Sequence, residues 1–348
     1  MTPIDTVTIN LQGEKEMLND KTILITGGTG SFGNHFTKYV LDHYKPKKII
    51  IYSRDEFKQF NMANKFKDHA DVLRFFIGDI RDKERFQRAL YGVDYVIHAA
   101  ALKQVPACEY NPIEAVKTNI DGAMNIVNAV LDSDSVKRVV ALSTDKAVNP
   151  INLYGGTKLV SDKLFIAANS YAGARDVRFS VVRYGNVAGS RGSVIPFFKN
   201  IIDNGGKELP ITDYRMTRFW ISLEEGVELV IKALNESNGG ETFISKIPSF
   251  KITDLAQAML PGCEMPEVGI REGEKLHEIM VTKEDSALTY EYENHYIIYP
   301  HFNWWGPEKI IPGGKKVEEG FEYSSGINKE WLSVEQLKDL ICKMDFNH

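Results

Sequence analysis

Short apolar runs alternate with helix-length amphipathic segments between residues 21 and 189. Nearly continuous Val and Ile in these runs is typical of strands buried on both faces, as in a parallel sheet covered by helices. Such a pattern predicts an α/β fold with a Rossmann-type doubly wound parallel sheet, whose ligand crevice lies at the C-terminal strand ends. The six runs are residues 21–26, 47–53, 72–79, 94–100, 137–144 and 177–186.

The pattern loosens after residue 189 and predicts a smaller α/β cap. Thr253 is the expected N-cap of one of its helices. From Ser286 onward aromatic residues, Gly and Pro are scattered without a period. We therefore expect a loosely held leader (1–20), a nucleotide-binding sheet domain (21–189) to which some later segments return, and a substrate-binding domain with a C-terminal extension (190–348). The helices expected in the last part are 193–205, 222–234, 251–260 and a segment near 333–344; strands and loops are expected in 208–220 and 239–248.

Composition narrows the class of protein. The 348 residues are 43% hydrophobic and 26% charged, with a formal net charge of -5, so the chain can bury a sizeable core and presents no basic field to nucleic acid. Three widely spaced cysteines favour a reducing, cytoplasmic setting over disulfides or zinc. The histidines lack HxxxH spacing, so we expect no metal. Without a long apolar run or a secretion signal, we expect no membrane partner.

A glycine-rich turn follows the first predicted strand, in the stretch TILITGGTGSFGNHF. Its glycines satisfy both GxGxxG (from Gly28) and GxxGxxG (from Gly27). Glycines permit a tight turn and a close approach of the backbone to a pyrophosphate, which then sits at a helix N-terminus. Because a strand precedes the turn and an amphipathic helix follows it, we interpret it as a dinucleotide-binding loop rather than a plain strand–helix turn. The expected cofactor contacts are Gly27, Thr29, Gly30, Ser31, Phe32 and Gly33.

The end of the second predicted strand indicates which dinucleotide binds. An enzyme that uses NAD usually carries an acid there for the ribose hydroxyls. Here Ser53 and Arg54 come first, and Lys58 follows one turn later. A hydroxyl and two cations favour the extra phosphate of NADP. In the alternative, Asp55 holds the ribose and Arg54 is solvated.

The third and fourth predicted strands end in further candidate cofactor contacts. Asp79 and Ile80 follow the third strand, where Asp79 either meets the adenine edge or caps the next helix. Ala99 and Ala100 in HAAALK supply small side chains where the cofactor must pass close to the backbone. Lys103, in the same stretch, is expected to contact both cofactor and substrate.

The fifth predicted strand runs into STDKAVNPINLYGGTK, residues 143–158. Tyr154 and Lys158 lie one helical turn apart and therefore share a face. A lysine cation beside a phenol is expected to lower the pKa of the tyrosine into the working range for proton transfer to a sugar hydroxyl. The same lysine can hold a nicotinamide ribose. A second lysine, Lys146, follows Asp145 just upstream.

The glycine loop, HAAALK, STDKA and YGGTK together resemble the extended short-chain dehydrogenase/reductases that modify nucleotide sugars. The resemblance continues through residues 183–198, 211–225 and 269–280. Within that group the chain is similar to the soluble UDP-N-acetylglucosamine 4,6-dehydratases that invert C5, the first enzymes of pseudaminic acid synthesis. The match spans roughly residues 20 to 340, with the leader and the region of Trp304 and Trp305 atypical.

The resemblance implies a role for each residue of this stretch. In such enzymes a hydride leaves the sugar's C4 for NADP, a base removes the C5 proton, water leaves from C6, and the hydride returns to C6. Lys146 is implied as the C5 base, Asp145 as the group that assists water departure, and Thr144 as the holder of the C4 oxygen, with Tyr154 and Lys158 for the redox step. A lysine base must be neutral, and we expect burial and the Lys158 cation to lower the pKa of Lys146.

Four alternatives stay open. Taken alone, Asp145 and Lys146 could be a capping acid with a solvated neighbour. A UDP-sugar 4-epimerase would use Tyr154 and Lys158 and leave Asp145 and Lys146 idle, and an NADP-sensing regulatory protein would need none of them. A retaining 4,6-dehydratase is the fourth alternative, and many of these carry Asp-Glu here. The membrane-anchored retaining relatives with Asp-Lys and the capsule-type inverting enzymes commonly lack the tyrosine, so Tyr154 and the lack of a membrane segment favour the soluble inverting class.

The substrate is expected to bind through residues of the second half. Arg218 and Arg271 are candidates for the diphosphate of UDP, because a guanidinium can bind phosphate bidentately. The resemblance implies that Glu274 accepts hydrogen bonds from the uridine ribose. Asn186 and Ser193 can donate to phosphate or uracil, whereas His277 and Arg183 are expected to be structural. The expected partners are UDP-N-acetylglucosamine and further copies of the chain, as a dimer or hexamer.

Overall fold

The computed structural model describes residues 17–189, 193–302 and 309–344, and a ten-stranded sheet dominates this part of the chain. Its strand order is β13-β11-β12-β8-β6-β5-β4-β1-β2-β3. The strands from β3 to β8 in this order pair in parallel. Their bounds are β1 (Thr22–Thr26), β2 (Lys48–Ser53), β3 (Leu73–Ile77), β4 (Tyr95–His98), β5 (Arg138–Thr144), β6 (Arg178–Tyr184) and β8 (Thr242–Ser245).

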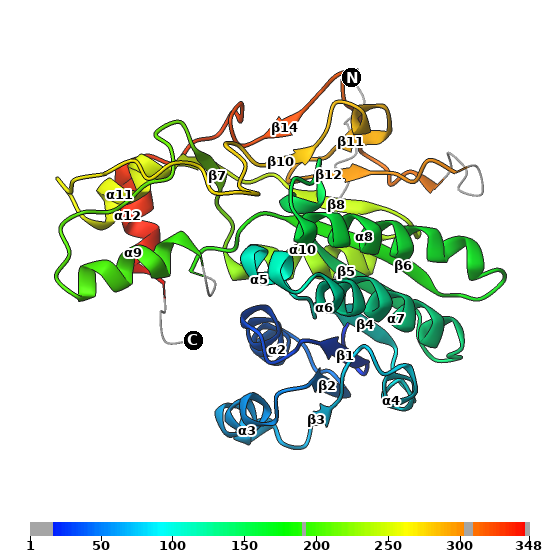
Figure 1. Cartoon of the computed structure of the whole chain (residues 1–348). Coiled ribbons are helices and arrows are strands. Elements are labelled where there is room, and N and C mark those ends of the chain that lie inside the picture. The colour runs from blue at the N-terminus through cyan, green and yellow to red at the C-terminus, as the bar shows by residue number, and fades with distance from the viewer. Residues whose placement is uncertain (1–16, 190–192, 303–308, 345–348) are drawn as a thin grey trace, which may run out of the picture.

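Helices cover both faces of this sheet, which explains the continuous apolar runs. In β1, Ile23 and Ile25 face one hydrophobic cluster and Leu24 faces the other. The first cluster is closed by α2 (Ser31–His43), α3 (Glu56–Lys65) and α10 (Leu223–Glu236). The second is closed by α4 (Lys83–Ala89), α7 (Gly122–Leu131) and α8 (Leu153–Tyr171), with α5 (Val105–Tyr110) and α6 (Pro112–Val116) alongside α8 (Figure 1). The predicted doubly wound α/β sheet is confirmed.

Residues beyond 189 return to this sheet. β8 pairs in parallel with β6, and α10 packs against α2, which lies far from it in the sequence. Three antiparallel strands, β12 (His295–Ile298), β11 (Thr289–Glu291) and β13 (Lys315–Lys316), then extend the sheet beyond β8. The sheet is therefore completed by segments that the sequence spreads over both halves.

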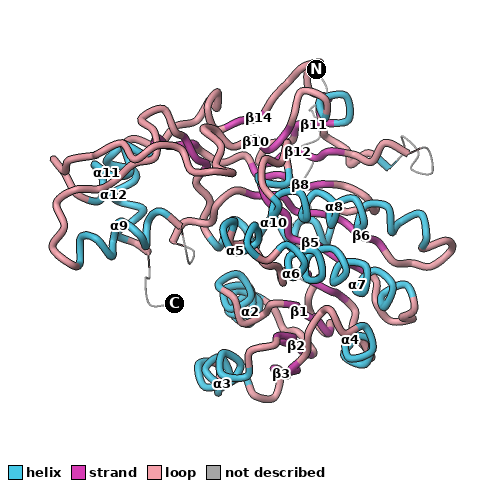
Figure 2. The backbone as a smooth tube through the Cα atoms, viewed as in Figure 1, coloured by secondary structure: helices cyan, strands magenta, loops and turns pink. Residues whose placement is uncertain are grey.

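The remaining segments form a smaller body with its own core. This body contains α9 (Val194–Asp203), α11 (Ile252–Met259) and α12 (Val334–Cys342), which lie together at one end of the molecule (Figure 1). Phe198, Trp220, Leu255 and Leu337 are buried in its core. Two short antiparallel ribbons join it to the sheet: β7 (Thr217–Phe219) with β9 (Ser249–Lys251), and β10 (Ile279–Val281) with β14 (Tyr323–Ser324). Loops connect these pieces over long stretches (Figure 2).

One predicted helix start is wrong. The N-cap of α11 is Lys251, without a side-chain capping bond, and Thr253 lies inside the first turn. The reason is that Lys251 still pairs with Thr217 in the β7–β9 ribbon, so the helix begins directly after the strand. Residues 1–16 of the leader, and Trp304 with Trp305, lie outside the described residues. In the described part of the chain, no helix combines the length and the apolar character that a bilayer crossing requires.

Candidate active site

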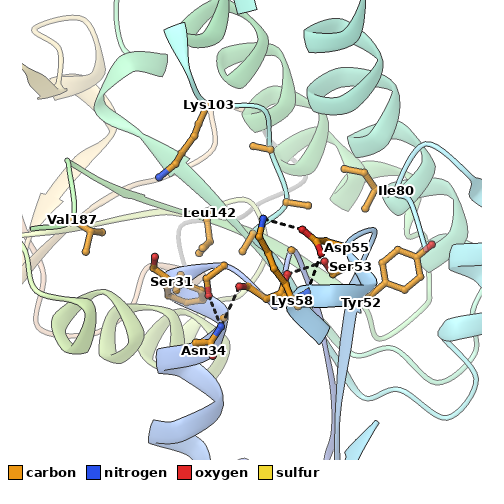
Figure 3. Close-up of a pocket in the computed structure, with 18 of the residues that line it drawn as sticks. Ser31, Asn34, Tyr52, Ser53, Asp55, Lys58, Ile80, Lys103, Leu142 and Val187 are labelled. Carbon is orange, nitrogen blue, oxygen red and sulfur yellow. Dashed lines mark hydrogen bonds and ion pairs between the residues drawn. The ribbon is translucent and has the colours of Figure 1, made fainter. Parts of the chain in front are cut away.

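A cavity of about 800 Å³ runs along the C-terminal ends of the parallel strands (Figure 3). The expected cofactor residues line it: Gly27, Thr29, Gly30, Ser31, Phe32, Gly33, Ser53, Arg54, Lys58, Asp79, Ile80, Ala99, Ala100, Lys103, Tyr154 and Lys158. The structure therefore brings together segments that follow β1, β2, β3, β4 and β5. Sequence reasoning missed several lining residues, among them Asn34, Tyr52, Asn61, Lys65, Leu142, Tyr184, Val187 and Leu223.

The glycine loop is shaped for close backbone contact. Gly27 has a φ of +64°, and a Cβ there would lie 2.8 Å from the Cα of Ala100. A Cβ on Gly33 would lie 2.2 Å from the carbonyl oxygen of Gly28. Asn34 donates from Nδ2 to the carbonyls of Thr29 (3.1 Å) and Gly30 (3.2 Å), which ties the loop to α2. The result is a cradle at a helix N-terminus that a side chain would fill and that a pyrophosphate fits.

The end of β2 carries the groups expected to select the cofactor. Ser53 Oγ lies 2.8 Å from Thr29 Oγ1. Asp55 accepts from the backbone N–H of Lys58 as the N-cap of α3, and its Oδ2 also lies 3.1 Å from Lys58 Nζ. Arg54 Nη1 lies 3.5 Å from Asp79 Oδ2, and about half of the Arg54 and Lys58 side chains is exposed. Asp55, the acid that would hold the ribose in the NAD alternative, thus already caps α3. The cations of Arg54 and Lys58 border the cavity.

Close packing of α8 sets the position of the catalytic stretch. Asp145–Ala147 forms a 3-10 turn after β5, and Asn152 then caps α8 by accepting from the backbone N–H of Gly155 at 2.8 Å. A Cβ on Gly155 would lie 2.1 Å from the carbonyl oxygen of Lys146. Glycine at this position therefore allows the helix that carries Tyr154 to lie directly against the Lys146 turn.

The amine of Lys146 is surrounded by acceptors. Its Nζ lies 3.0 Å from Asp145 Oδ1, 3.1 Å from Asn186 Oδ1 and 3.3 Å from Glu278 Oε1. Burial lowers the pKa of Lys146, but the two carboxylates raise it more, so the pKa is raised above its ordinary value. The expected lowering of this pKa is wrong, because the nearest charges are Asp145 and Glu278 rather than the Lys158 cation.

Tyr154 also departs from expectation. Burial raises the pKa of Tyr154 to about 12, although Lys146 and a hydrogen bond with Thr144 act in the lowering direction. The expected lowering through Lys158 is wrong, because burial removes the solvation of the phenolate. Lys158 is buried too, and its pKa is lowered by burial while the Asp162 carboxylate opposes that shift.

Asp145 is a buried acid held against Lys146. Thr144 Oγ1 donates to Asp145 Oδ1 at 2.9 Å. Burial and the charge of Glu278 raise the pKa of Asp145, while Lys146 opposes that rise. Thr144, Lys146, Tyr154 and Lys158 line the cavity, and Asp145 lies directly behind Lys146.

Two carboxylates of the site were missed from the sequence. Asp162 on α8 accepts a hydrogen bond from Ser143 Oγ at 2.5 Å and lies 3.9 Å from Arg183 Nη2. Its charge acts to raise the pKa of Lys158 against the effect of burial. Glu278 contacts Lys146 across 132 residues of chain. The available signals were an acid one turn after Lys158 on the same helix, and an acid directly before the apolar triplet of β10.

The expected substrate residues separate into two groups. Asn186 lines the main cavity and, with Ser193 and Arg218, a small apolar pocket beside it that includes Trp220 and Phe250. Arg218 is buried, donates to the carbonyls of Thr217 (2.7 Å) and Leu276 (3.2 Å), and lies 3.6 Å from Glu278 Oε1.

Arg271 and Glu274 lie on the loop between α11 and β10, outside the lining of both spaces. Asn152 ties this loop to α8 by donating to the Gly273 carbonyl at 2.8 Å. Glu274 Oε2 is buried without a hydrogen-bond partner among the described residues.

The two residues expected to be structural make structural contacts. His277 Nδ1 lies 2.8 Å from Thr217 Oγ1, and Arg183 donates to the Met280 carbonyl at 2.8 Å. Among the described residues, no group of His, Cys, Asp and Glu is arranged to hold a metal ion.

Comparison with known proteins agrees with this geometry. The family described as "Polysaccharide biosynthesis protein" matches residues 23–300. A UDP-N-acetylglucosamine 4,6-dehydratase (inverting) from Campylobacter jejuni is 58% identical over 331 residues, covering 93% of this chain and 98% of the relative. A UDP-glucose 4-epimerase from Rickettsia massiliae is 41% identical over 338 residues, covering 95% and 98%. The X-ray structure of Pen from Bacillus thuringiensis is 37% identical with a TM-score of 0.84, covering 93% and 98%. The chain therefore belongs to the polysaccharide biosynthesis protein family, within the extended short-chain dehydrogenases/reductases.

Proposed function

We propose that this protein is a UDP-N-acetylglucosamine 4,6-dehydratase that inverts C5 and forms UDP-2-acetamido-2,6-dideoxy-beta-L-arabino-hex-4-ulose. The observation that carries the proposal is the Lys146–Asp145 pair, joined at 3.0 Å beside Tyr154 on the cavity wall. An amine and a carboxyl in contact are the base and the acid that removal of water from a sugar needs. The relative with 58% identity bears the same name.

We propose NADP as the cofactor. The cradle of Gly27 and Gly33 fits a pyrophosphate, and Ser53, Arg54 and Lys58 would hold the additional phosphate of NADP. When bound, the nicotinamide supplies reversible hydride storage, so the reaction needs no net oxidant. Lys158 would hold the nicotinamide ribose, while Ala99 and Ala100 leave room for the cofactor near β4.

Two side chains would act at C4 of the sugar. Tyr154 takes the proton of the C4 hydroxyl as that carbon is oxidised, and Thr144 holds the C4 oxygen. The raised pKa of Tyr154 means that the phenol is protonated at rest, so it must pass its proton on before it accepts another. Lys146 lowers that pKa and lies on the same wall of the cavity, which supports a role in this transfer.

Elimination would then use the Lys146–Asp145 pair. The C4 ketone acidifies the C5 proton, which Lys146 removes. Asp145 gives a proton to the C6 hydroxyl as it leaves as water. Delivery of the proton that the C4 hydroxyl gave up to the opposite face of C5 inverts the centre and closes the proton balance.

The UDP part would bind at the other side of Lys146. Asn186, Ser193 and Arg218 surround the small pocket beside the cavity and offer donors to phosphate or uracil. Lys103 points into the cavity and would contact both ligands (Figure 3). Arg271 and Glu274 lie on the neighbouring loop, and we assign them to the diphosphate and the uridine ribose.

A 4-epimerase is the second candidate, and the Rickettsia relative favours it. It would use Tyr154 and Lys158 alone. The buried contacts of Lys146 argue against it, because a lysine without a chemical role would more easily lie in solvent than between two carboxylates.

Mass spectrometry distinguishes these functions. The purified protein is incubated with UDP-N-acetylglucosamine and no added cofactor. A product lighter by one water supports the dehydratase. Unchanged mass with a new sugar isomer supports the epimerase. No conversion contradicts both and leaves the NADP-sensing protein as the remaining alternative.

We propose a cytoplasmic homo-oligomer, a dimer or hexamer, that begins pseudaminic acid synthesis. Within each chain, residues 21–189 would bind the cofactor, with later segments that return to the sheet, and residues 190–348 would bind the substrate. The thiols of Cys108, Cys263 and Cys342 are free, which supports a reducing compartment.

A further inference from the structure

A second carboxylate faces the Lys146 amine. Glu278 Oε1 lies 3.3 Å from Lys146 Nζ and 3.6 Å from Arg218 Nε. Only 1% of Glu278 is exposed, and its other oxygen, Oε2, is buried without a hydrogen-bond partner among the described residues. Burying an ionised carboxylate costs solvation free energy. We therefore expect Glu278 to have a role in the site.

The backbone of Glu278 is fixed by neighbouring strands. Its N–H donates to Ser325 Oγ at 2.9 Å, and its carbonyl accepts from the Ser325 N–H at 2.8 Å. Ser325 Oγ also lies 2.8 Å from Thr217 Oγ1 in β7. Because three strand segments meet here, the carboxylate is held at a fixed place relative to the Lys146 turn.

The charges around Glu278 favour its ionised form. Burial raises the pKa of Glu278, but Lys146, Arg218 and Lys275 lower it by more. The ionised carboxylate in turn raises the pKa of Asp145, together with burial, and that of Lys146. Two further titratable groups face Lys146, namely Tyr154 and Lys103.

We propose that Glu278 is a positioning residue for the elimination: its carboxylate orients the Lys146 amine, and its charge keeps one proton shared within the Lys146–Asp145 pair. This inference rests on the proposed dehydratase function. The pair is joined at 3.0 Å, so the proton can pass from the ammonium to the carboxylate and leave a neutral amine and a neutral acid.

The elimination of water balances without another reactant. As the C5–H bond breaks, its proton goes to Lys146; as the C6–O bond breaks, the Asp145 proton goes to the departing hydroxide and forms water. The electron pair of the C5–H bond becomes the new bond between C5 and C6. The pair is then ammonium and carboxylate again, which is its resting form.

The test is Glu278→Gln, which keeps the shape and removes the charge. We expect kcat for water loss to fall roughly 100-fold, with a much smaller change in KM. A nearby carboxylate stabilises the protonated form of the pair, so without it the pair loses its proton at lower pH. The alkaline limb of the pH–rate profile should therefore move to lower pH by about one unit or more.

Two further variants separate positioning from simple folding. Glu278→Asp retains the charge, so kcat should fall while the alkaline limb stays near that of the wild type. Glu241→Gln alters another fully buried carboxylate, bonded to Ser237 and Gly239 outside the cavity, and should lower only the melting temperature.

A wild-type pH profile and kcat in Glu278→Gln would overturn the inference, as would a loss of activity that only follows the unfolded fraction. If Glu278→Gln does not fold, Glu278→Asp decides: a folded variant with unchanged kcat overturns the proposal. A wild-type protein that removes no water contradicts the proposed function instead, so the two failures are distinguishable.

Discussion

The two ends of the cavity are built in different ways. At the cofactor end, the contacts come from short segments directly after β1 and β2, and the charges of Arg54 and Lys58 are half exposed. At the catalytic end, Lys146 meets Glu278 and, through it, Arg218, and both of these partners are almost fully buried. An exposed charged side chain loses little solvation free energy when it binds a ligand, whereas buried charges shift the pKa values of the groups beside them.

The largest expected effect tests the catalytic end. Lys146→Ala removes the base, so turnover of UDP-N-acetylglucosamine should fall by about 1000-fold or more, while cofactor binding at the other end persists. Lys163→Ala is the matched control, because Lys163 is an exposed lysine on α8 outside the cavity lining. Both are measured by product formation and by cofactor titration. Wild-type turnover in Lys146→Ala would remove the lysine from the mechanism.

An intermediate effect tests the packing between α8 and the Lys146 turn. Gly155→Ala places a methyl group 2.1 Å from the Lys146 carbonyl and should destabilise the fold by about 2 kcal/mol and lower kcat. Its neighbour is the control, because a Cβ on Gly156 meets nothing within 4 Å. Gly156→Ala should stabilise the helix by about 0.5 kcal/mol. Equal melting temperatures for the two variants would contradict this packing.

The smallest effect tests the cofactor end. Arg54→Ala should weaken NADP binding about tenfold and leave NAD binding nearly unchanged, because only NADP carries the additional phosphate. Since Arg54 is half exposed, the loss should shrink at high salt. Lys67→Ala, an exposed lysine outside the cavity lining, is the control. Equal weakening for NAD and NADP would refute selection by charge at this end.

The difference between the two ends of the cavity also explains which features of the site could be predicted from the sequence. Strand periodicity and the glycine spacing are local, and they located the parallel strands and the loops after β1 to β5 that line the cavity. The protonation of Lys146 is not local, because Glu278 reaches it from 132 residues away and is held there by Ser325, which follows β14 and contacts Thr217 of β7. Proximity to Lys158 in sequence predicted the wrong sign, since the field at an amine depends on which carboxylates the fold brings to it.

Local reasoning failed at Thr253 for a related reason. A threonine favours a helix start, but the pairing of Lys251 with Thr217 holds the chain extended up to the helix and sets its first residue. Tertiary pairing overrides capping preference there. The same limit applies to Arg218, whose contact with Glu278 depends on two ribbons that approach from separate parts of the chain.

The central claim is that Lys146 takes a proton from C5 of a sugar whose C4 is oxidised. Its most direct test is the reaction in deuterated water, followed from the first turnovers by NMR at C5. The claim predicts deuterium at C5 with the L-arabino configuration in the wild type, and neither in Lys146→Ala. A product that keeps its hydrogen and its original configuration at C5 would contradict it.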